Sequence, residues 1–177
     1  MRLSTERDEP TESVDLRPFM SGFPTGVAIV STFDGADRPW GMTCTSMCSV
    51  TLSPPTLLVC LRQDSPTLQA LLTTGTFSVN LLADHAQPAA ALFGSGAPDR
   101  FDRVAWDRPD HLGGPHLYRE AHAIADCRVD QHSLVGDHVM VLGEVIRTSQ
   151  ESESAPLLYG RREYASWPIR DRAALAY

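Results

Sequence analysis

The feature that most constrains the fold of this chain is a two-residue alternation that begins at Met42 and ends at Ser53. Its odd positions carry mostly hydroxyl side chains and its even positions mostly apolar ones, with Ser46 and Met47 exchanged. A period of two is typical of an extended strand with two unlike faces. The sequence therefore predicts an extended, two-faced segment over 42–53, which a Ser-Pro-Pro sequence ends.

The hydroxyl side of this segment has two interpretations. Hydroxyl groups and backbone amides on one face can hold a phosphate or a flat polar ring without any charged side chain. The same residues also make an ordinary surface strand, because threonine favours strands. The alternation alone leaves both interpretations open.

The rest of the sequence predicts a mainly β protein with a few short helices. A turn signal at 34–37 joins expected strands 25–33 and 39–47 into a hairpin. Ser65 as N-cap and Gly75 after the last turn bound a helix. Short connections between six or seven strands favour an antiparallel barrel over a doubly wound sheet. The other expected elements are a short helix at 14–21 with Leu16, Phe19 and Met20 inward, strands at 56–61, 77–82, 121–131 and 138–148, a helix at 84–93, and a last strand or a pair of turns at 157–164.

Length and composition limit the possible functions. A chain of 177 residues suits one domain, which we expect at 14–177 after a disordered tail at 1–13. All 15 basic residues are arginine, which excludes a Walker lysine and a Schiff-base lysine. The net charge of −7 argues against nucleic acid or an anionic membrane as partner. There is no long apolar run and no secretory signal, so we expect a cytoplasmic protein.

The cysteines and histidines give no sign of a metal site. No Cys-x-x-Cys pair occurs, and the histidine spacings match no zinc or iron ligand set, so no metal is expected. A glycine-containing segment at 94–99 lacks the third glycine of a dinucleotide fingerprint and predicts a loop. We expect buried, reduced thiols at Cys44, Cys48, Cys60 and Cys127.

Three segments together resemble a known family. They are FPTGVAIVST at 23–32, GMTCTSMCSVTLSPPTLLVCL at 41–61 and HSLVGDHVMVLGEV at 132–145. In this order and at these spacings they are similar to the flavin reductase family, the reductase components of two-component monooxygenases. The resemblance implies an antiparallel Greek-key split barrel of the flavin-binding type, with a few short peripheral helices.

The resemblance also implies a set of flavin contacts. Several of them have an equally simple structural explanation: Pro24 and Thr25 as a turn before a strand, Ser65 as an N-cap, Asn80 as a strand residue that satisfies backbone groups, and Arg100 as a solvated loop residue. Tyr164 belongs to a late aromatic group that is equally suited to packing. The implied flavin contacts are Pro24, Thr25, Thr43, Cys44, Thr45, Ser46, Ser49, Val50, Thr51, Ser65, Asn80, Arg100, Phe101 and Tyr164.

A second implied constellation consists of Gly136, Asp137 and His138. The resemblance places the nicotinamide nucleotide there, over the flavin, with His138 in the catalytic role. A neutral imidazole can donate to a carboxamide or lie beside a ring. The structural alternative is a Gly-Asp turn followed by an ordinary strand-end histidine.

The implied activity is hydride transfer from NADH or NADPH to FAD or FMN. Basic residues are scarce around His138, which slightly favours NADH. The resemblance further implies a homodimer that treats flavin as a substrate and supplies free reduced flavin to a separate monooxygenase. Two alternatives stay open: a flavin-retaining oxidase similar to pyridoxamine-phosphate oxidase, and a flavin- or haem-binding module without activity.

Overall fold

The computed structural model describes residues 14–168. The expected disordered tail at 1–13 therefore lies outside the described residues. None of the described helices is both long and apolar enough to cross a membrane.

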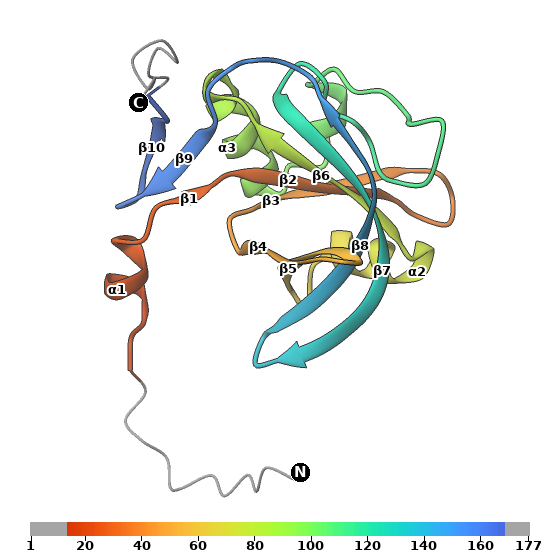
Figure 1. Ribbon diagram of the computed structural model, residues 1–177, viewed down its shortest axis with the longest axis horizontal. Coiled ribbons are helices and arrows are strands. Elements are labelled where there is room, and N and C mark those ends of the chain that lie inside the picture. Colours follow the sequence, from red (N-terminus) through yellow and green to blue (C-terminus); the bar gives the residue numbers. More distant parts are fainter. Residues whose placement is uncertain (1–13, 169–177) are drawn as a thin grey trace, which may run out of the picture.

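Most of the fold is one antiparallel seven-stranded sheet, in the order β3-β2-β6-β7-β8-β5-β4 (Figure 1). Strands β3 and β4 are consecutive in the chain but form the two opposite edges of this sheet. Only Thr45 and Ser46 separate them, and such a link spans at most about 11 Å, so the sheet curls until its edges meet. The strands are β2 (Ala28–Phe33), β3 (Pro39–Cys44), β4 (Met47–Leu52), β5 (Pro55–Arg62), β6 (Thr76–Leu82), β7 (Ala121–Val135) and β8 (His138–Gln150). The result is the split barrel that the sequence predicts.

A second, three-stranded sheet lies beside the barrel. It contains β1 (Thr25–Gly26), β9 (Leu157–Gly160) and β10 (Glu163–Ser166), in the order β1-β9-β10. The expected strand 25–33 is thus divided between two sheets. Val27 lies at the transition between the two sheets: its N–H donates to the carbonyl of Leu157 in β9, and its own carbonyl accepts from the N–H of Leu82 in β6. Figure 1 shows α1, β1, β9 and β10 together on one side of the barrel.

The expected hairpin between β2 and β3 is confirmed, with Ala28 opposite Cys44 and Phe33 opposite Pro39. The β7–β8 hairpin is longer than expected: β7 extends to Val135 instead of residue 131, and β8 to Gln150 instead of residue 148. Only Gly136 and Asp137 separate the two strands. Gly136 has a φ of 61°, a conformation that suits glycine.

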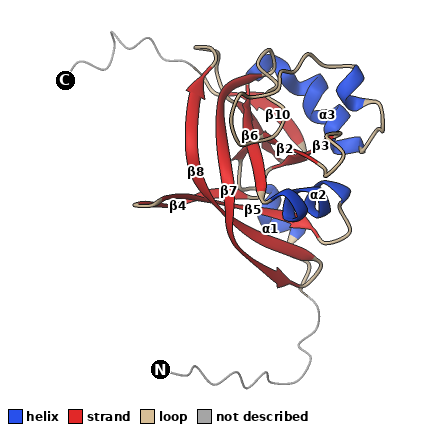
Figure 2. Ribbon diagram, turned by 90° about the vertical axis from the view of Figure 1, so that its right-hand side faces the viewer, coloured by secondary structure: helices blue, strands red, loops and turns tan. Residues whose placement is uncertain are grey.

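Two buried clusters hold the elements together. The barrel interior contains Val59, Leu61, Phe77 and Val141, with Leu71 of helix α2 (Pro66–Thr74) packed into it. The second cluster contains residues from β2, α3 (Gln87–Ser95), η2 (Arg100–Asp102), β9 and the loop before β7, namely Ile29, Phe93, Phe101, Leu117 and Leu157. Figure 2 shows α2 and α3 on the same side of the curved sheet.

The helices confirm some end signals and correct others. Helix α2 has the expected caps: Ser65 Oγ accepts from the N–H of Leu68, and Gly75 has a φ of 70°. The helix expected at 84–93 begins instead with a 3₁₀ turn, η1 (Asp84–Ala86), before α3. Helix α1 (Arg17–Ser21) is shorter than the expected 14–21, and its expected inward residues were wrong: Phe19 is 76% exposed and Leu16 60%.

The four cysteines are all free thiols. Cys44 and Cys127 are buried as expected, and Cys60 is half-buried. The expectation was wrong for Cys48, which is exposed because its neighbour Met47 packs against the core and successive side chains of a strand point to opposite faces.

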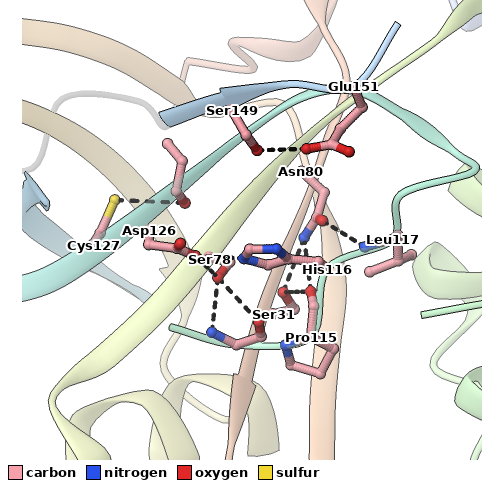
Figure 3. A network of polar contacts seen from close by, with 12 residues as sticks. Ser31, Ser78, Asn80, Pro115, His116, Leu117, Asp126, Cys127, Ser149 and Glu151 are labelled. Atoms are coloured by element: carbon pink, nitrogen blue, oxygen red, sulfur yellow. Dashed lines mark hydrogen bonds and ion pairs between the residues drawn. The ribbon is translucent and has the colours of Figure 1, made fainter. Parts of the chain in front are cut away.

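A buried polar network ties the loop before β7 to the barrel wall (Figure 3). The Asn80 amide donates to Ser31 Oγ at 2.9 Å and its carbonyl oxygen accepts from the N–H of Leu117 at 2.8 Å. The Asp126 carboxylate accepts from Ser78 at 2.6 Å and from His116 at 2.7 Å. These bonds offset the cost of burying the polar groups.

Candidate functional site

The break between β3 and β4 opens into a cavity of about 380 Å³. Three of the hydroxyl residues predicted from the sequence line it: Thr25, Thr45 and Ser46. Phe23 and Tyr159 supply apolar walls, and Arg161 lines the same cavity. Residues from three separate parts of the chain therefore converge at the point where the barrel edges meet.

The local sequence explains why the strand breaks here. Met42 and Cys44 both contact the barrel core, and so does Met47. Even positions face the core before the break and an odd position faces it afterwards, so the exchange of Ser46 and Met47 marks a change of face. The continuous segment expected over 42–53 is therefore wrong at Thr45 and Ser46, which lie between the two strands.

Ser46 fixes this break to the neighbouring strand. Its carbonyl accepts from the N–H of Cys60 at 2.9 Å, and its hydroxyl donates to the Cys60 carbonyl at 2.9 Å. In contrast, the hydroxyl of Thr45 has no hydrogen-bond partner among residues 14–168. Thr45 therefore presents a free donor and acceptor to the cavity.

Thr43 and Cys44, also predicted as flavin contacts, have structural partners instead. The Thr43 hydroxyl donates to the Ala90 carbonyl of α3 at 2.6 Å. Cys44 is 4% exposed, and burial raises the pKa of its thiol. Ser49, Val50 and Thr51 follow on β4, where all three side chains are exposed along the sheet edge.

Four other predicted flavin contacts are buried in the protein: Ser65, Asn80, Arg100 and Phe101. Ser65 caps α2 and donates to the sulfur of Met42 at 3.2 Å. Asn80 is completely buried and bonded through both amide atoms, so a flavin contact for it has no structural support.

Arg100 is neither a solvated loop residue nor a cavity residue. It is only 7% exposed, and its guanidinium donates to the carbonyls of Gly41 at 2.8 Å and Ala97 at 2.7 Å. Phe101 is 8% exposed and packs edge-on against Phe93 in the second core cluster. Both residues attach the loop after α3 to β3.

Gly136, Asp137 and His138 form the turn and first residue of the β7–β8 hairpin. His138 Nδ1 lies 2.8 Å from Asp137 Oδ1, and since a carboxylate only accepts, the Nδ1–H donates. This bond and the charge of His138 lower the pKa of Asp137. In neutral His138 the bond leaves Nε2 as the free acceptor.

Strand β5 connects this histidine to the cavity. Arg62 pairs with His138, and Cys60, two residues earlier, bonds to Ser46. Two residues along a strand correspond to about 7 Å and adjacent strands lie about 5 Å apart. His138 therefore lies one strand away from Cys60 and two residues further along, and it does not line the cavity. This position leaves His138 available to a second molecule bound beside the flavin.

Pro24 and Tyr164 line an adjacent cavity of about 380 Å³ under the β9–β10 hairpin. The rings of Tyr159 and Tyr164 lie 5.1 Å apart, and burial raises the pKa of the Tyr164 hydroxyl. Sequence reasoning missed Phe23, Tyr159 and Arg161. The signal for Tyr159 is its register opposite Thr25, which only the sheet pairing reveals.

These residues fit an isoalloxazine ring better than a metal ion. A flat ring needs apolar or aromatic walls and a few hydroxyl or amide groups along its polar edge. Phe23 and Tyr159 provide the first, and Thr25 and Thr45 the second. Among residues 14–168, no group of three histidine, cysteine or acidic side chains is close enough to hold a metal.

Comparison with known proteins gives a consistent result. Residues 20–168 match the model of the flavin reductase-like domain family. A flavin reductase (NADPH) from Lentzea aerocolonigenes is 49% identical over 168 residues, covering 93% of this chain and 98% of the relative. The reductase subunit of a flavin-dependent monooxygenase from Rhodococcus jostii is 36% identical over 156 residues, covering 86% and 78%.

A solved structure has the same fold. The NADH:FAD oxidoreductase of Streptomyces globisporus C-1027, in complex with NAD and FAD fragments, superposes with a TM-score of 0.81 at 32% identity. The match covers 89% of this chain and 98% of the other.

Proposed function

Because this chain belongs to the flavin reductase-like domain family, we propose that it is an NAD(P)H-dependent flavin reductase. The observation that carries the proposal is the 49% identity to a flavin reductase over 93% of this chain. Flavin supplies the chemistry as hydride acceptor, and reduced nicotinamide is the donor. The protein's task is to bind and orient the two molecules and to exclude water.

Thr25, Thr45 and Ser46 bind the polar edge of the flavin ring, and Phe23 and Tyr159 form the apolar walls around it. The support for this assignment is their convergence on one cavity and the free hydroxyl of Thr45. Ser49, Val50 and Thr51 remain proposed contacts for the phosphate side, because β4 leaves them exposed next to the break.

His138 positions the nicotinamide nucleotide rather than transferring a proton. Its Nδ1–H is held by Asp137, which fixes the orientation of the ring and leaves Nε2 for the nucleotide. Hydride transfer between two cofactors requires no protein acid or base, so loss of His138 weakens nucleotide binding more than it slows the chemical step.

The reduced flavin leaves and is used by a separate monooxygenase. In support of this, the Rhodococcus relative is named as the reductase subunit of a flavin-dependent monooxygenase. A binding site built from hydroxyl groups, with no lysine in the chain, suits a flavin that is a substrate. The alternatives of a flavin-retaining oxidase and an inactive binding module have no support among the relatives described above.

The functional unit is a homodimer of single-domain subunits, domain 14–177, in the cytoplasm. Support for the dimer comes from large apolar side chains that are exposed on α1 and β4: Phe19 on α1 is 76% exposed, and Val50 and Leu52 on β4 are 50% and 87% exposed. Burying these side chains against a second copy removes apolar surface from water.

A steady-state assay that crosses FAD and FMN with NADH and NADPH tests the proposal. We expect turnover with at least one pair. The sequence favours NADH, whereas the Lentzea relative is named for NADPH, so the assay also decides nucleotide preference. Absence of turnover with all four pairs contradicts the proposed function.

A further inference from the structure

The tip of the β9–β10 hairpin consists of two arginines in an unusual backbone conformation. Arg161 has a φ of 50° and Arg162 a φ of 65°, and they are the two residues between the strands. Two-residue hairpin turns with positive φ at both positions strongly favour Asn-Gly or Gly-Gly, because a Cβ atom disfavours this region. Two consecutive arginines therefore occupy positions where local stability alone selects other residues, which points to a functional reason.

The hairpin tip is held in a defined position. The N–H of Arg161 donates to the carbonyl of Ser21, the last residue of α1, at 2.7 Å. On the strand before the tip, Gly160 packs so closely to Pro24 that an added Cβ would lie 3.2 Å from it. The two guanidinium groups therefore project from an anchored turn.

The charges of both arginines lack a partner in the part of the chain that the structure describes. Within residues 14–168, neither forms an ion pair or a side-chain hydrogen bond. The neighbouring Arg17 differs, because Asp15 holds its guanidinium at 2.8 Å. Two unpaired cations side by side in a protein of net charge −7 form a local site for an anion.

These charges face cavities rather than a flat surface. Arg161 and Arg162 line a cavity of about 430 Å³ together with Ser21, Arg17 and Asp15, the carboxylate that pairs with Arg17. Both also line the cavity that contains Thr45 and Ser46. The basic site is thus continuous with the cavity that receives the flavin ring.

We propose that Arg161 and Arg162 bind a phosphate group of a nucleotide substrate. This inference rests on the proposed function for the identity of that substrate: the phosphates of the flavin nucleotide or the 2′-phosphate of NADPH. Guanidinium groups bind phosphate oxygens through paired, charge-assisted hydrogen bonds, and arginine is the only strongly basic side chain available in this chain.

The double variant Arg161→Asn/Arg162→Gly tests the site while keeping the turn. It removes both charges and installs the turn sequence that this backbone favours, so its folding is secure. The matched control is Arg161→Lys/Arg162→Lys, which keeps the charges. The two readouts are the KM of FAD relative to riboflavin, which lacks phosphate, and the KM of NADPH relative to NADH.

The expected result is a rise of about tenfold in one of these ratios, typical of losing a charge-assisted phosphate contact, with most of the effect restored in the lysine control. A rise in the FAD ratio assigns the flavin phosphates, and a rise in the NADPH ratio assigns the 2′-phosphate. Changes below about threefold in both ratios overturn the inference.

Calorimetry with ADP and 2′,5′-ADP, against adenosine, separates this inference from the proposed function. A wild-type protein that binds either phosphate compound, and a double variant that binds it at least about threefold more weakly, supports the site even without flavin turnover. Equal binding by both proteins, or none by either, counts against the site, while turnover in the wild type still supports the reductase.

Discussion

The Nε of Arg100 donates to the carbonyl of Gly41 at 2.8 Å, across 59 residues of sequence. This bond attaches the loop after α3 to strand β3, directly before the hydroxyl segment of the cavity. Gly41 allows the approach, since an added Cβ there would lie 3.0 Å from the ring of Phe101. The loop acts on the site through the position of β3.

Arg100→Ala therefore lowers stability rather than flavin affinity. The change removes the buried donor to the Gly41 carbonyl, a loss that costs about 1–3 kcal/mol. The Ala97 carbonyl loses the guanidinium but keeps the backbone N–H of Arg100 as a donor. Urea unfolding measures this loss, with Arg103→Ala as the control, because Arg103 is exposed and forms only a 3.9 Å ion pair. A stable Arg100→Ala protein with a strongly raised flavin KM contradicts the structural role.

Thr45→Val and Thr43→Val form a matched pair. The first removes a hydroxyl that faces the cavity, and the second removes one that donates to Ala90. Loss of one hydrogen bond corresponds to about 1 kcal/mol, so we expect Thr45→Val to raise the flavin KM roughly fivefold at unchanged stability. Thr43→Val should lose about 1 kcal/mol of stability instead. The reverse pattern would place the flavin on the α3 side of β3.

His138→Ala raises the KM for the nicotinamide nucleotide about fivefold or more, as expected for losing one or two contacts to a bound ligand. Unfolding free energy changes little, because the side chain is 44% exposed at the end of a hairpin. His132→Ala is the control, an exposed histidine in β7 of the same hairpin. Initial-rate kinetics with varied nucleotide and saturating flavin check the prediction, and equal effects of the two variants would refute it.

Cys48 is the first cysteine to react with a thiol reagent. It is exposed, whereas Cys127 is buried and burial raises the pKa of its thiol to about 12. Because the thiolate is the nucleophile, Cys127 stays unreactive until the protein unfolds. Maleimide labelling followed by mass spectrometry should mark Cys48 first, and Cys48→Ser should remove the fast phase. Early labelling of Cys127 would mean that the barrel opens readily.

The parts of the fold that follow from local chemistry could be predicted from the sequence. The Ser65 and Gly75 signals bound α2 correctly, and the turn at 34–37 joins β2 to β3. These features depend on residues a few positions apart, so a single sequence contains them.

The features that depend on tertiary partners could not be predicted. A period of two indicates that 42–53 is extended. The exchange of Ser46 and Met47, however, is equally consistent with an irregularity within one strand and with a break between two strands. Arg100 and Asn80 are polar residues that usually lie outside a core, and only their distant partners explain their burial. The opposite error occurs at Phe19, which was expected to face inward but is exposed. An apolar residue on a five-residue helix does not indicate which surface, if any, covers it.

The most direct test of the central claim is an anaerobic titration of the flavin-free protein with FAD or FMN, followed by addition of NADH or NADPH. The account predicts weak, reversible flavin binding that Thr45→Val weakens further, and loss of the oxidised flavin absorbance when the nucleotide is added. A flavin that binds equally well to both proteins, and whose absorbance neither nucleotide changes, would contradict it.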